Sequence, residues 1–398
     1  MALIAVSDAL ERVLSKAALL PPEMVPLAAA HGRVLASDLK ALRTQPPEDV
    51  SAMDGYAVRA ADIAAVPVDL KVIGEVAAGR PFTGRVGPGQ AARIFTGGVI
   101  PSGADTIAVQ ENAEREGNRV RILKSTPAGK HIRSAGLDFK SGDVLLSRGR
   151  LLTGRDVTLA AATNHPAIPV ARRAKVAVFA TGDELVMPGS SPGPGQIVYS
   201  NGYAVAALAQ SEGADVIDLG IVADCVEDTI AAVRRAREAG ADVLVTTGGA
   251  SVGEYDLVQK AFAAEGLSLS FWKVALRPGR PLMHGLLGGT HVLGLPGNPV
   301  SAFVCAFLFL VPLLRRLAGR ADILPQAESA VLGDDLPAND ERADYLRATL
   351  SAGTATPLPV QDSSLMQALA RADCLIIREP LEHAASRGEP CRILKLPL

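Results

Sequence analysis

Small polar and acidic residues follow four apolar runs of the sequence, at the points where buried strands are expected to end. The first run ends in TGDE at 181–184, the second reaches Asp224, and the third ends in TTGGASVG at 246–253. A later run ends in LPGNP at 295–299. In open α/β sheets, ligands bind beyond the carboxyl ends of the strands. These four ends should therefore converge on one edge and form a ligand-binding site.

The stretch TTGGASVG offers phosphate-binding chemistry without a standard phosphate motif. Gly248 and Gly253 have G-x-x-x-x-G spacing, but no lysine follows, so the stretch is not a P-loop. Its glycines and Ser251 could present backbone N–H groups to a phosphate. The alternative is a tight turn in which Ser251 caps the next helix. In LPGNP, Asn298 as N-cap and Pro299 as first helical residue give a similar ligand-free explanation.

Charged residues indicate an anionic ligand and a hard metal ion. Three cations surround a Pro-Gly turn, where they form either a solvated turn or a local anion site: Lys273, Arg277 and Arg280. The available acids are Asp54, Asp138, Glu184, Asp224 and Asp256. Carboxylates without clustered histidine or cysteine suit Mg²⁺, which bridges protein acids and substrate phosphates. The pattern predicts an enzyme that handles a phosphorylated anion with Mg²⁺.

The stretch SAMDGYAV at 51–58 places Asp54 directly before a glycine. Asp-Gly is a common turn dipeptide, because glycine tolerates positive φ and aspartate bonds its own backbone. Taken alone, Asp54 is therefore explained equally well as a surface turn residue. A functional role requires partners elsewhere in the chain.

Composition excludes several classes of protein. Charged residues make up 21% of the 398 residues and the formal net charge is −2, so no overall field attracts nucleic acid or an anionic membrane. The four cysteines and six histidines lack the spacing of a disulfide framework or zinc site. The longest apolar run, 302–314, is too short to span a membrane and predicts a buried helix. The start of the sequence shows no basic leader, which predicts a cytoplasmic protein.

Changes in hydrophobic period divide the chain. Helical spacing predicts a helix over 8–20, and short β runs punctuated by glycine occupy 46–138. From 175 onward, buried runs alternate with helical segments, which is the pattern of a doubly wound, mostly parallel sheet. Short alternating runs after 319 predict a small β domain. The expected internal helices cover 154–164, 202–212, 226–239 and 254–265.

Six blocks of sequence resemble those of one family, in the same order and over nearly the whole chain. They are SAMDGYAV, IFTGGVIPSGADTIAVQE, ATGDEL, TTGGASVGEYD, WKVALRPGRPL and GLPGNPVSAF. The chain thus resembles the molybdopterin molybdenumtransferases of the MoeA type, an architecture also found in the C-terminal part of gephyrin. The resemblance implies that adenylylated molybdopterin is hydrolysed in the presence of molybdate and Mg²⁺, which yields molybdenum cofactor and AMP.

The resemblance also implies a multidomain α/β plus β fold and a homodimer of elongated subunits. A discontinuous linker domain would cover 1–45 and 139–172, and a β-rich insert domain would cover 46–138. A three-layer, doubly wound α/β domain at 173–318 would bind the molybdenum cofactor, and a small β-barrel domain would occupy 319–398. The active site would lie between the α/β domain of one subunit and the insert domain of the other.

Carried over residue by residue, the resemblance assigns both sides of this cleft. The predicted catalytic residues are Asp54, Thr96, Asp138, Glu184, Asp224 and Asp256. The last three would also bind Mg²⁺. A further set would bind the pyrophosphate, the pterin and the oxyanion: Gly248, Gly249, Ser251, Lys273, Arg277, Pro278, Gly279, Pro296, Asn298 and Pro299.

Two departures from the family pattern bear on these roles. The residues before SAMDGYA read PPEDV, where relatives usually have an aromatic residue and Asn, and this change would alter the rim of the cleft. Arg280 stands where Lys is more usual, which keeps the charge and changes the donor geometry. Met283 and His284 replace an aromatic pair, and we expect His284 to be a packing residue.

Three rival functions were weighed against this one. A molybdopterin adenylyltransferase normally needs only the α/β domain, so the flanking β domains argue against it. The complete block around SAMDGYA disfavours a nucleotide-cleaving enzyme of the competence-damage-related type. The retained Asp54 and Glu184 disfavour a non-catalytic carrier or scaffold, which is the use that gephyrin makes of this architecture. A molybdopterin adenylyltransferase and downstream molybdoenzyme-maturation proteins are possible partners, whereas nucleic acid and membrane are not expected.

Overall fold

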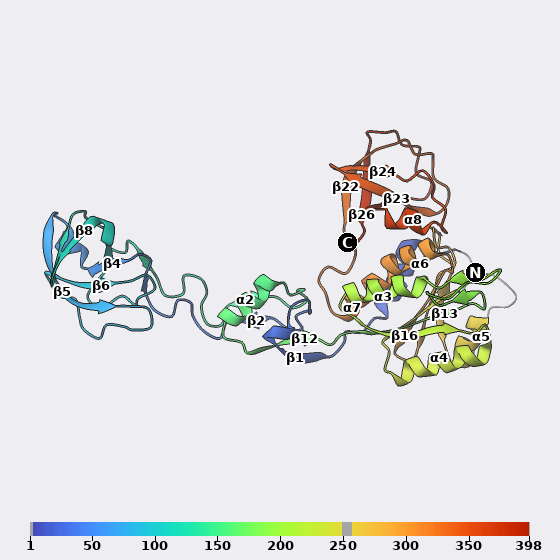
Figure 1. Cartoon of the computed structure of the whole chain (residues 1–398), viewed down its shortest axis with the longest axis horizontal. Coiled ribbons are helices and arrows are strands. Elements are labelled where there is room, and N and C mark those ends of the chain that lie inside the picture. Colours follow the sequence, from blue (N-terminus) through green and yellow to red (C-terminus); the bar gives the residue numbers. More distant parts are fainter. Residues whose placement is uncertain (1–2, 249–256, 398) are drawn as a thin grey trace.

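The computed structural model describes residues 3–248 and 257–397. Figure 1 shows an elongated molecule with the β-rich insert domain at one end and the linker domain in the middle. The α/β domain and the C-terminal β domain lie together at the other end. This arrangement confirms the expected multidomain α/β plus β fold.

A six-stranded sheet forms the α/β domain in the order β16-β13-β17-β21-β20-β18. The first four strands in this order are parallel to one another. At the other edge β20 pairs antiparallel with β21, and β18 pairs antiparallel with β20. Their bounds are β13 (Lys175–Thr181), β16 (Asp215–Val222), β17 (Val243–Thr247), β18 (Ser268–Trp272), β20 (Met283–Leu287) and β21 (Thr290–Leu295). The short strands β14 (Leu185–Val186) and β15 (Ile197–Val198) pair beside the sheet.

Alternate side chains of β13 enter two separate cores. Val176 and Val178 pack towards one face, under α3 (Asn201–Ser211), whereas Ala177 and Phe179 pack against the helices of the other face. Those helices are α4 (Val226–Glu238) and α5 (Leu257–Ala264). Because successive strand residues point to opposite faces, helices cover both sides of the sheet (Figure 1). The three-layer, doubly wound prediction is therefore confirmed.

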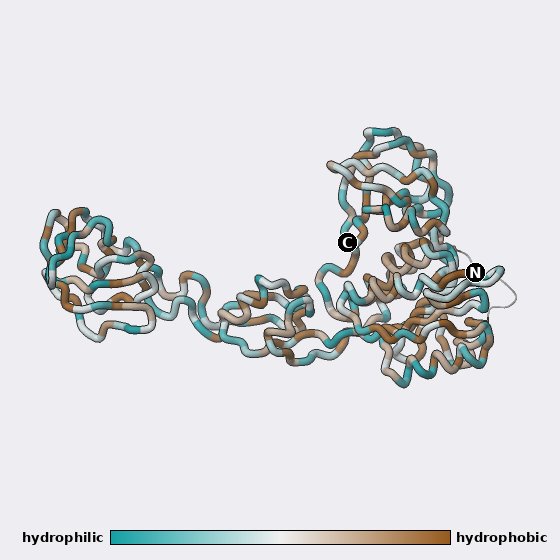
Figure 2. Tube along the Cα trace, viewed as in Figure 1, coloured by the Kyte–Doolittle hydropathy of each residue, from teal (hydrophilic) through white to brown (hydrophobic). Residues whose placement is uncertain are grey.

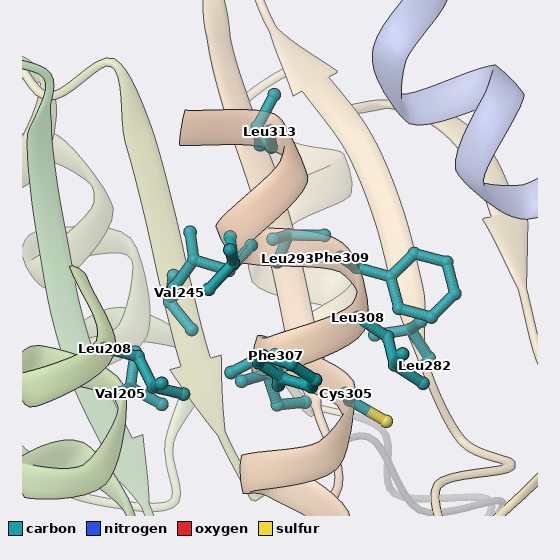
Figure 3. Packing of buried hydrophobic residues seen from close by; sticks show 14 of the residues in the cluster. Val205, Leu208, Val245, Leu282, Leu293, Cys305, Phe307, Leu308, Phe309 and Leu313 are labelled. Atoms are coloured by element: carbon teal, nitrogen blue, oxygen red, sulfur yellow. The ribbon is translucent and has the colours of Figure 1, made fainter. Parts of the chain in front are cut away.

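The apolar run at 302–314 lies in one long buried helix. It consists of α6 (Pro299–Cys305), a π-helical turn η4 (Ala306–Leu310) and α7 (Val311–Leu317). Phe307 from this helix lies on the side of Val205 of α3, whereas Phe309 points to the opposite side, near Leu282, and all four belong to the same core (Figure 3). In the described part of the chain it is the one helix long and apolar enough to cross a membrane, and 83% of its most apolar stretch is buried within the protein. It is the core helix that the sequence predicts.

The linker domain is small, and the first helix does not pack in it. Its pairs are β1 (Pro22–Pro26) with β12 (Ala167–Ala171) and β2 (Leu39–Lys40) with β11 (Val144–Leu146), next to η1 (Leu27–Ala29) and α2 (Gly154–Ala162). Helix α1 (Val6–Ser15) instead buries Ala9 and Val13 in the core of the α/β domain. Residues 1–45 were expected in the linker domain, but the apolar face of α1 finds its complementary surface on the long helix.

The insert domain is built on a six-stranded sheet in the order β7-β4-β6-β5-β9-β8. Its strands are β4 (Gly55–Val58), β5 (Val68–Val76), β6 (Gln90–Ile94), β7 (Thr106–Val109), β8 (Ala113–Glu116) and β9 (Arg119–Ile122), with the short helices η2 (Ala60–Ile63) and η3 (Gln110–Asn112). A further pair joins β3 (Val50–Ser51) to β10 (Ile132–Arg133). The two connections to the linker domain meet at a bridge between Gln45 and Phe139.

The C-terminal domain is a closed five-stranded barrel. Strand pairing runs β23-β24-β22-β26-β25 and returns to β23, which confirms the β-barrel prediction. The bounds are β22 (Ala327–Leu332), β23 (Ala343–Ser351), β24 (Thr354–Pro357), β25 (Cys374–Arg378) and β26 (Pro390–Lys395), with α8 (Met366–Ala370) beside them. Strand β19 (Leu276–Arg277) adds in parallel to β23. Figure 2 shows hydrophobic residues following the strands of the α/β sheet, whereas the barrel exposes more hydrophilic residues.

Candidate active site

A cavity of about 350 Å³ lies at the carboxyl ends of three neighbouring parallel strands. Thr181 and Thr247 are the last residues of β13 and β17, and both line it. Gly248 follows directly at φ 85°, where an added Cβ would stand 2.5 Å from the carbonyl oxygen of Thr181. Glycine is therefore required for the two strand ends to approach. The other polar lining residues are Glu184, Ser200, Asn201, Gly297, Asn298 and Ser364.

Acidic residues gather beside this cavity. The Oδ1 atom of Asp183 accepts a hydrogen bond of 3.2 Å from the backbone N–H of Asp224. Although the Asp224 side chain is exposed, partial desolvation at the end of β16 raises its pKa, and the carboxylates of Asp183 and Glu184 raise it further. The ends of β13, β17 and β21 thus meet at the cavity. Asp224, which follows β16, is close enough to Glu184 for the two charges to interact.

The predicted metal ligands are described only in part. Glu184 and Asp224 supply carboxylate oxygens near each other, and Asp256 lies outside the described residues. Within 3–248 and 257–397, no three His, Cys, Asp or Glu side chains are grouped as a metal site. Gly249 and Ser251 of the glycine loop also lie outside the described residues. Their assignments stay predictions.

The PGNP loop contacts the barrel domain. Pro299 is the first residue of α6 and Asn298 its N-cap, but the Asn298 side chain makes no cap hydrogen bond. Its Nδ2 donates instead to Oγ of Ser363 at 2.8 Å. Asn201 Nδ2 donates to the Gly297 carbonyl at 2.7 Å. The structure therefore does not support the ligand-free alternative in which the Asn298 side chain caps α6, because this amide bonds another domain. Pro296 is buried, and the ligand-binding roles of Pro296 and Asn298 stay predictions.

The cationic turn faces the barrel domain and does not line the cavity. Arg277 forms ion pairs with Asp340 and with Asp344, the latter at 3.1 Å. The ammonium of Lys273 lies 5.6 Å from the ring centre of Trp272. Pro278 and Gly279 turn against α6, where an added Cβ on Gly279 would clash with the sulfur of Cys305. None of these predicted ligand-binding residues lines the cavity at the strand ends.

His284 is buried as a packing residue. It is fully inaccessible to solvent, and its Nε2 lies 3.2 Å from Nδ1 of His291. Burial, together with the smaller effect of the neighbouring His291, lowers the pKa of His284 to about 3. The His284 ring therefore stays neutral near pH 7 and does not carry charge to the candidate site.

In the insert domain, Asp54 and Thr96 form a pair. Oδ1 of Asp54 accepts hydrogen bonds from the backbone N–H of Thr96 at 2.7 Å and from its hydroxyl at 2.8 Å. These bonds hold the pKa of Asp54 below its usual value. Gly55 begins β4, and an added Cβ would stand 2.1 Å from the carbonyl oxygen of Ala108. The glycine is thus required by strand packing, and the Asp54 carboxylate is free for another role.

Asp138 does not join this pair. Its side chain is exposed and its backbone N–H donates to the carbonyl of Gln45 at 3.0 Å, at the connection to the linker domain.

Arg93, which the sequence analysis missed, does lie beside the pair of Asp54 and Thr96. Arg93 on β6 donates to Gln110 Oε1 at 2.6 Å, lies 4.7 Å from the ring centre of Phe95, and lowers the pKa of Asp54 through its charge. Its position directly before the block IFTGG was the available signal.

Other cavity residues were also missed. Tyr199, Ser200 and Asn201 line the cavity at the start of α3. Their signal was the pair Ser-Asn before a predicted helix, which is typical of a helix N-terminus. Ser364 and Met366 come from the barrel domain. Nothing in their local sequence relates them to strand ends that lie at 181, 247 and 295.

The two halves of the predicted site lie far apart within one chain. Figure 1 shows β4 and β6 of the insert domain at one end of the molecule, and β13 and β16 of the α/β domain at the other. The linker domain separates them (Figure 1). A single chain therefore does not bring Asp54 and Thr96 to the cavity that Glu184 lines.

Three family models match the chain. The one described as MoeA N-terminal region (domain I and II) matches residues 4–163. The model described as probable molybdopterin binding domain matches 177–316, which contains the strand ends around the cavity. The MoeA C-terminal region (domain IV) matches 329–396. The matches extend over nearly the whole chain.

Named relatives and solved structures agree with these models. A molybdopterin molybdenumtransferase of Nostoc sp. is 42% identical over 75% of this chain and 70% of its own length. Molybdopterin molybdenumtransferase 2 of Mycobacterium tuberculosis is 37% identical over 89% of this chain and 90% of its own. A crystal structure of a molybdopterin biosynthesis MoeA protein from Pyrococcus horikoshii is 31% identical, covers 99% of both chains and superposes with a TM-score of 0.88.

Proposed function

The chain belongs to the MoeA family of molybdopterin molybdenumtransferases, and we propose from this premise that it inserts molybdenum into adenylylated molybdopterin and releases AMP. The observation that carries the proposal is the cavity at the ends of β13, β17 and β21. It lies inside the segment that matches a molybdopterin-binding model. It also occupies the edge of the sheet at which open α/β folds bind ligands.

The chain's own groups suit a substrate with a pyrophosphate and a heterocycle. The strand ends present small residues and backbone groups at Thr247 and Gly248, which leave room for phosphate oxygens. Ile197, Val198 and Tyr199 form an apolar side of the same cavity. Water attacks phosphorus, the P–O bond to AMP breaks, and the molybdopterin phosphate is left as the other product. In the same process molybdate binds the two dithiolene sulfurs, and the oxo ligand that they displace leaves as water with the two thiol protons.

The acids beside the cavity suit Mg²⁺ as the metal of this reaction. Glu184 and Asp224 supply hard oxygen donors. The negative charges of Asp183 and Glu184 contribute to the raised pKa of Asp224, and a bound cation would offset this repulsion. Mg²⁺ is usually held by one or two carboxylates together with substrate phosphates, so a larger protein cluster is not needed. When bound, the ion would neutralise the pyrophosphate and stabilise the departing AMP.

We further propose that a second copy of the chain completes the site. Asp54 is partly exposed, and its hydrogen bonds to Thr96 favour the ionised carboxylate. It lies too far from its own chain's cavity to act there (Figure 1). A homodimer in which each insert domain reaches the partner's α/β domain would bring Asp54 and Glu184 together. In this form the protein would act in the cytoplasm, between a molybdopterin adenylyltransferase and proteins that mature molybdoenzymes.

The test is the release of AMP from adenylylated molybdopterin by the wild-type protein, with Mg²⁺ and with or without molybdate. We expect release that depends on molybdate and is lost when Mg²⁺ is chelated. Binding of the substrate without release under any oxyanion would contradict the proposal and leave a carrier or scaffold. Formation of adenylylated molybdopterin from ATP would identify an adenylyltransferase instead.

A further inference from the structure

We propose that Arg93 is a positioning residue for Asp54, because its side chain clamps the backbone on which that carboxylate stands. The clamp consists of the Arg93 guanidinium, the side chain of Gln110 and the backbone of Asp54 and Gly55. The inference rests on the proposed function, since it takes Asp54 as the group that the insert domain supplies to the cavity of a second chain. It deepens that function by naming the residue that keeps Asp54 in place.

The two ends of the Arg93 guanidinium bond two different segments of the insert domain. Nη1 donates to the carbonyl oxygen of Gly55 at 3.2 Å, and Nη2 donates to Oε1 of Gln110 at 2.6 Å. The backbone N–H of Gln110 in turn donates to the carbonyl oxygen of Asp54 at 3.1 Å. A planar guanidinium presents its donors on a rigid fork, which a lysine ammonium does not reproduce. Asp54 is thus held through the residue that follows it and through its own carbonyl oxygen.

The sheet of the insert domain brings the parts of this clamp together. Strand β4 lies between β6 and β7. Arg93 is on β6, where it lies opposite Tyr56, and Gln110 directly follows β7. Asp54 immediately precedes β4. The clamp therefore ties the beginning of the middle strand to both of its neighbours, at the point where Asp54 leads into the sheet.

Two aromatic rings fix the direction of the Arg93 side chain. Its guanidinium carbon lies 4.7 Å from the ring centre of Phe95 and 5.2 Å from that of Tyr56. The Tyr56 ring is itself held in the core of the insert domain, where it is buried. Contacts between a guanidinium and a ring face stabilise one orientation of the cation. Arg93 is therefore pre-organised, and the clamp needs no ligand in order to form.

Arg93 also acts on the carboxylate through its charge. The hydrogen bonds from Thr96 lower the pKa of Asp54 most, and the positive charge of Arg93 adds to them. Within the ranges 3–248 and 257–397, no other charged group shifts this pKa. Thr96 holds Oδ1 of the carboxylate, while the clamp holds the backbone from which the carboxylate extends. Position and charge are two separate contributions of Arg93, so they can be removed separately.

The first arm of the test measures molybdate-dependent AMP release and separates position from charge. Arg93→Gln removes the fork and the charge, and we expect kcat to fall about tenfold with KM unchanged, as for an interaction that acts only on the reacting group. The acid limb of activity should move to higher pH, because loss of the positive charge raises the pKa of Asp54. Arg93→Lys should restore the acid limb but not kcat, since it returns the charge without the fork.

Two further variants complete this arm. Gln110→Ala removes an exposed side chain, so it should fold, and loss of its one hydrogen bond to Arg93 should lower kcat about threefold with the acid limb in place. Arg121→Gln is the matched control, because it removes an exposed arginine of the same domain that pairs with Asp69. It should match the wild type in kcat, KM and pH profile.

The second arm follows the Asp54 carboxyl carbon by NMR titration of the whole chain, without substrate. The Asp54 resonance should titrate at higher pH in Arg93→Gln than in the wild type. It should titrate at an unchanged pH in Arg93→Lys and in Arg121→Gln. This measurement does not depend on turnover, so it tests the effect of the Arg93 charge independently of the reaction.

The outcomes separate this inference from the proposed function. If the wild type releases no AMP, or if Asp54→Ala keeps full release, the proposed site is overturned and the inference with it. If Asp54→Ala loses release but Arg93→Gln and Gln110→Ala both match Arg121→Gln, only the clamp is overturned. A raised KM with unchanged kcat in Arg93→Gln would assign Arg93 to substrate binding and would also overturn its positioning role. An unmoved Asp54 titration in Arg93→Gln would overturn the effect of its charge.

Discussion

The two small β domains of this chain are attached in opposite ways. The barrel is fixed to the α/β domain by pairing of β19 with β23, by the ion pairs of Arg277 and by the hydrogen bond from Asn298 to Ser363. The insert domain is joined to the linker domain by two connections that meet at Gln45 and Phe139 (Figure 1). The barrel lines the cavity of its own chain through Ser364 and Met366, whereas the insert domain lies at the far end of the molecule and could reach a cavity only in the proposed dimer.

Two aspartates show the same contrast at the level of chemistry. Hydrogen bonds from Thr96 lower the pKa of Asp54, which is partly exposed and lies beside Arg93. Burial is the main cause of the raised pKa of Asp344, although Arg277 opposes it. The first carboxylate is partly accessible and its lowered pKa favours the ionised form, which fits the role proposed for it. The second is enclosed in a domain contact, where its loss should affect stability.

The largest effect should come from Asp54→Ala. If the insert domain supplies a reacting group, molybdate-dependent AMP release should fall about 10²-fold or more, while substrate binding is retained. The matched control is Asp69→Ala, which removes an exposed carboxylate of the same domain that pairs with Arg121. The control should keep wild-type activity. Equal activity of Asp54→Ala and Asp69→Ala would remove the insert domain from the chemistry.

Next in size is the loss of a buried ion-pair network at the ends of α3 and α7 in the α/β domain. Glu212, at the end of α3, accepts from Arg315 and from Arg320, and all three side chains are largely buried. Glu212→Gln should lower the free energy of unfolding by about 3 kcal/mol, because the largely buried Arg315 loses its charge partner and Arg320 keeps only Asp322. Urea unfolding measures the change. The exposed pair of Glu328 with Lys395 provides the control, since Glu328→Gln should change stability by no more than about 0.5 kcal/mol.

A smaller change should follow Arg277→Ala. The variant leaves the largely buried carboxylate of Asp344 without its arginine, so the free energy of unfolding should fall by about 1–3 kcal/mol. Arg280→Ala, at a neighbouring exposed cation, should change it by at most about 0.5 kcal/mol. The variant also distinguishes a structural role from a functional one, because Arg277 was predicted to bind the ligand. A large rise in KM with unchanged stability would return Arg277 to the substrate and count against its assignment to barrel docking.

The smallest effect concerns the pKa of Asp54. Thr96→Val removes the hydroxyl donor to the carboxylate, so the pKa of Asp54 should rise towards its ordinary value. Because the pKa in the folded protein is lowered, the stabilisation from this bond is present above the unfolded pKa and is lost as pH falls through the folded one. The acid limb of activity should therefore move to higher pH in the variant. An NMR titration of the Asp54 carboxyl carbon measures the shift directly, and no movement would exclude the hydroxyl bond as a cause.

The sequence predicted best where local pattern and packing agree. The apolar run of β13 with its TGDE end, the core helix at 302–314 and a small β domain at the C-terminus follow from residue patterns, and the structure has all three. The closure of that domain into a barrel was implied only by the family resemblance. The role of Asp54 was harder to predict, because the dipeptide Asp-Gly is also typical of a surface turn. The structure shows that Gly55 is needed for packing against Ala108 within the sheet.

Contacts between domains could not be predicted from the sequence. One explanation of Asn298 was that its side chain caps its own helix, but the amide donates to Ser363 of the barrel instead. Arg277 was grouped with ligand-binding cations, although Asp344 lies 67 positions further along the chain and pairs with it. Such choices depend on which surfaces meet after the domains have folded. Periodicity and motif spacing carry no information about that meeting.

The most direct test of the shared active site mixes two inactive variants. Asp54→Ala damages the insert side of the cleft and Glu184→Ala damages the strand-edge side. If each site combines the insert domain of one subunit with the α/β domain of its partner, a mixed dimer contains one fully intact site. Co-expression should then restore about a quarter of wild-type AMP release, because half of the dimers are mixed and each has one working site. If every chain builds its own site, both chains of the mixed dimer are defective and the mixture should stay inactive.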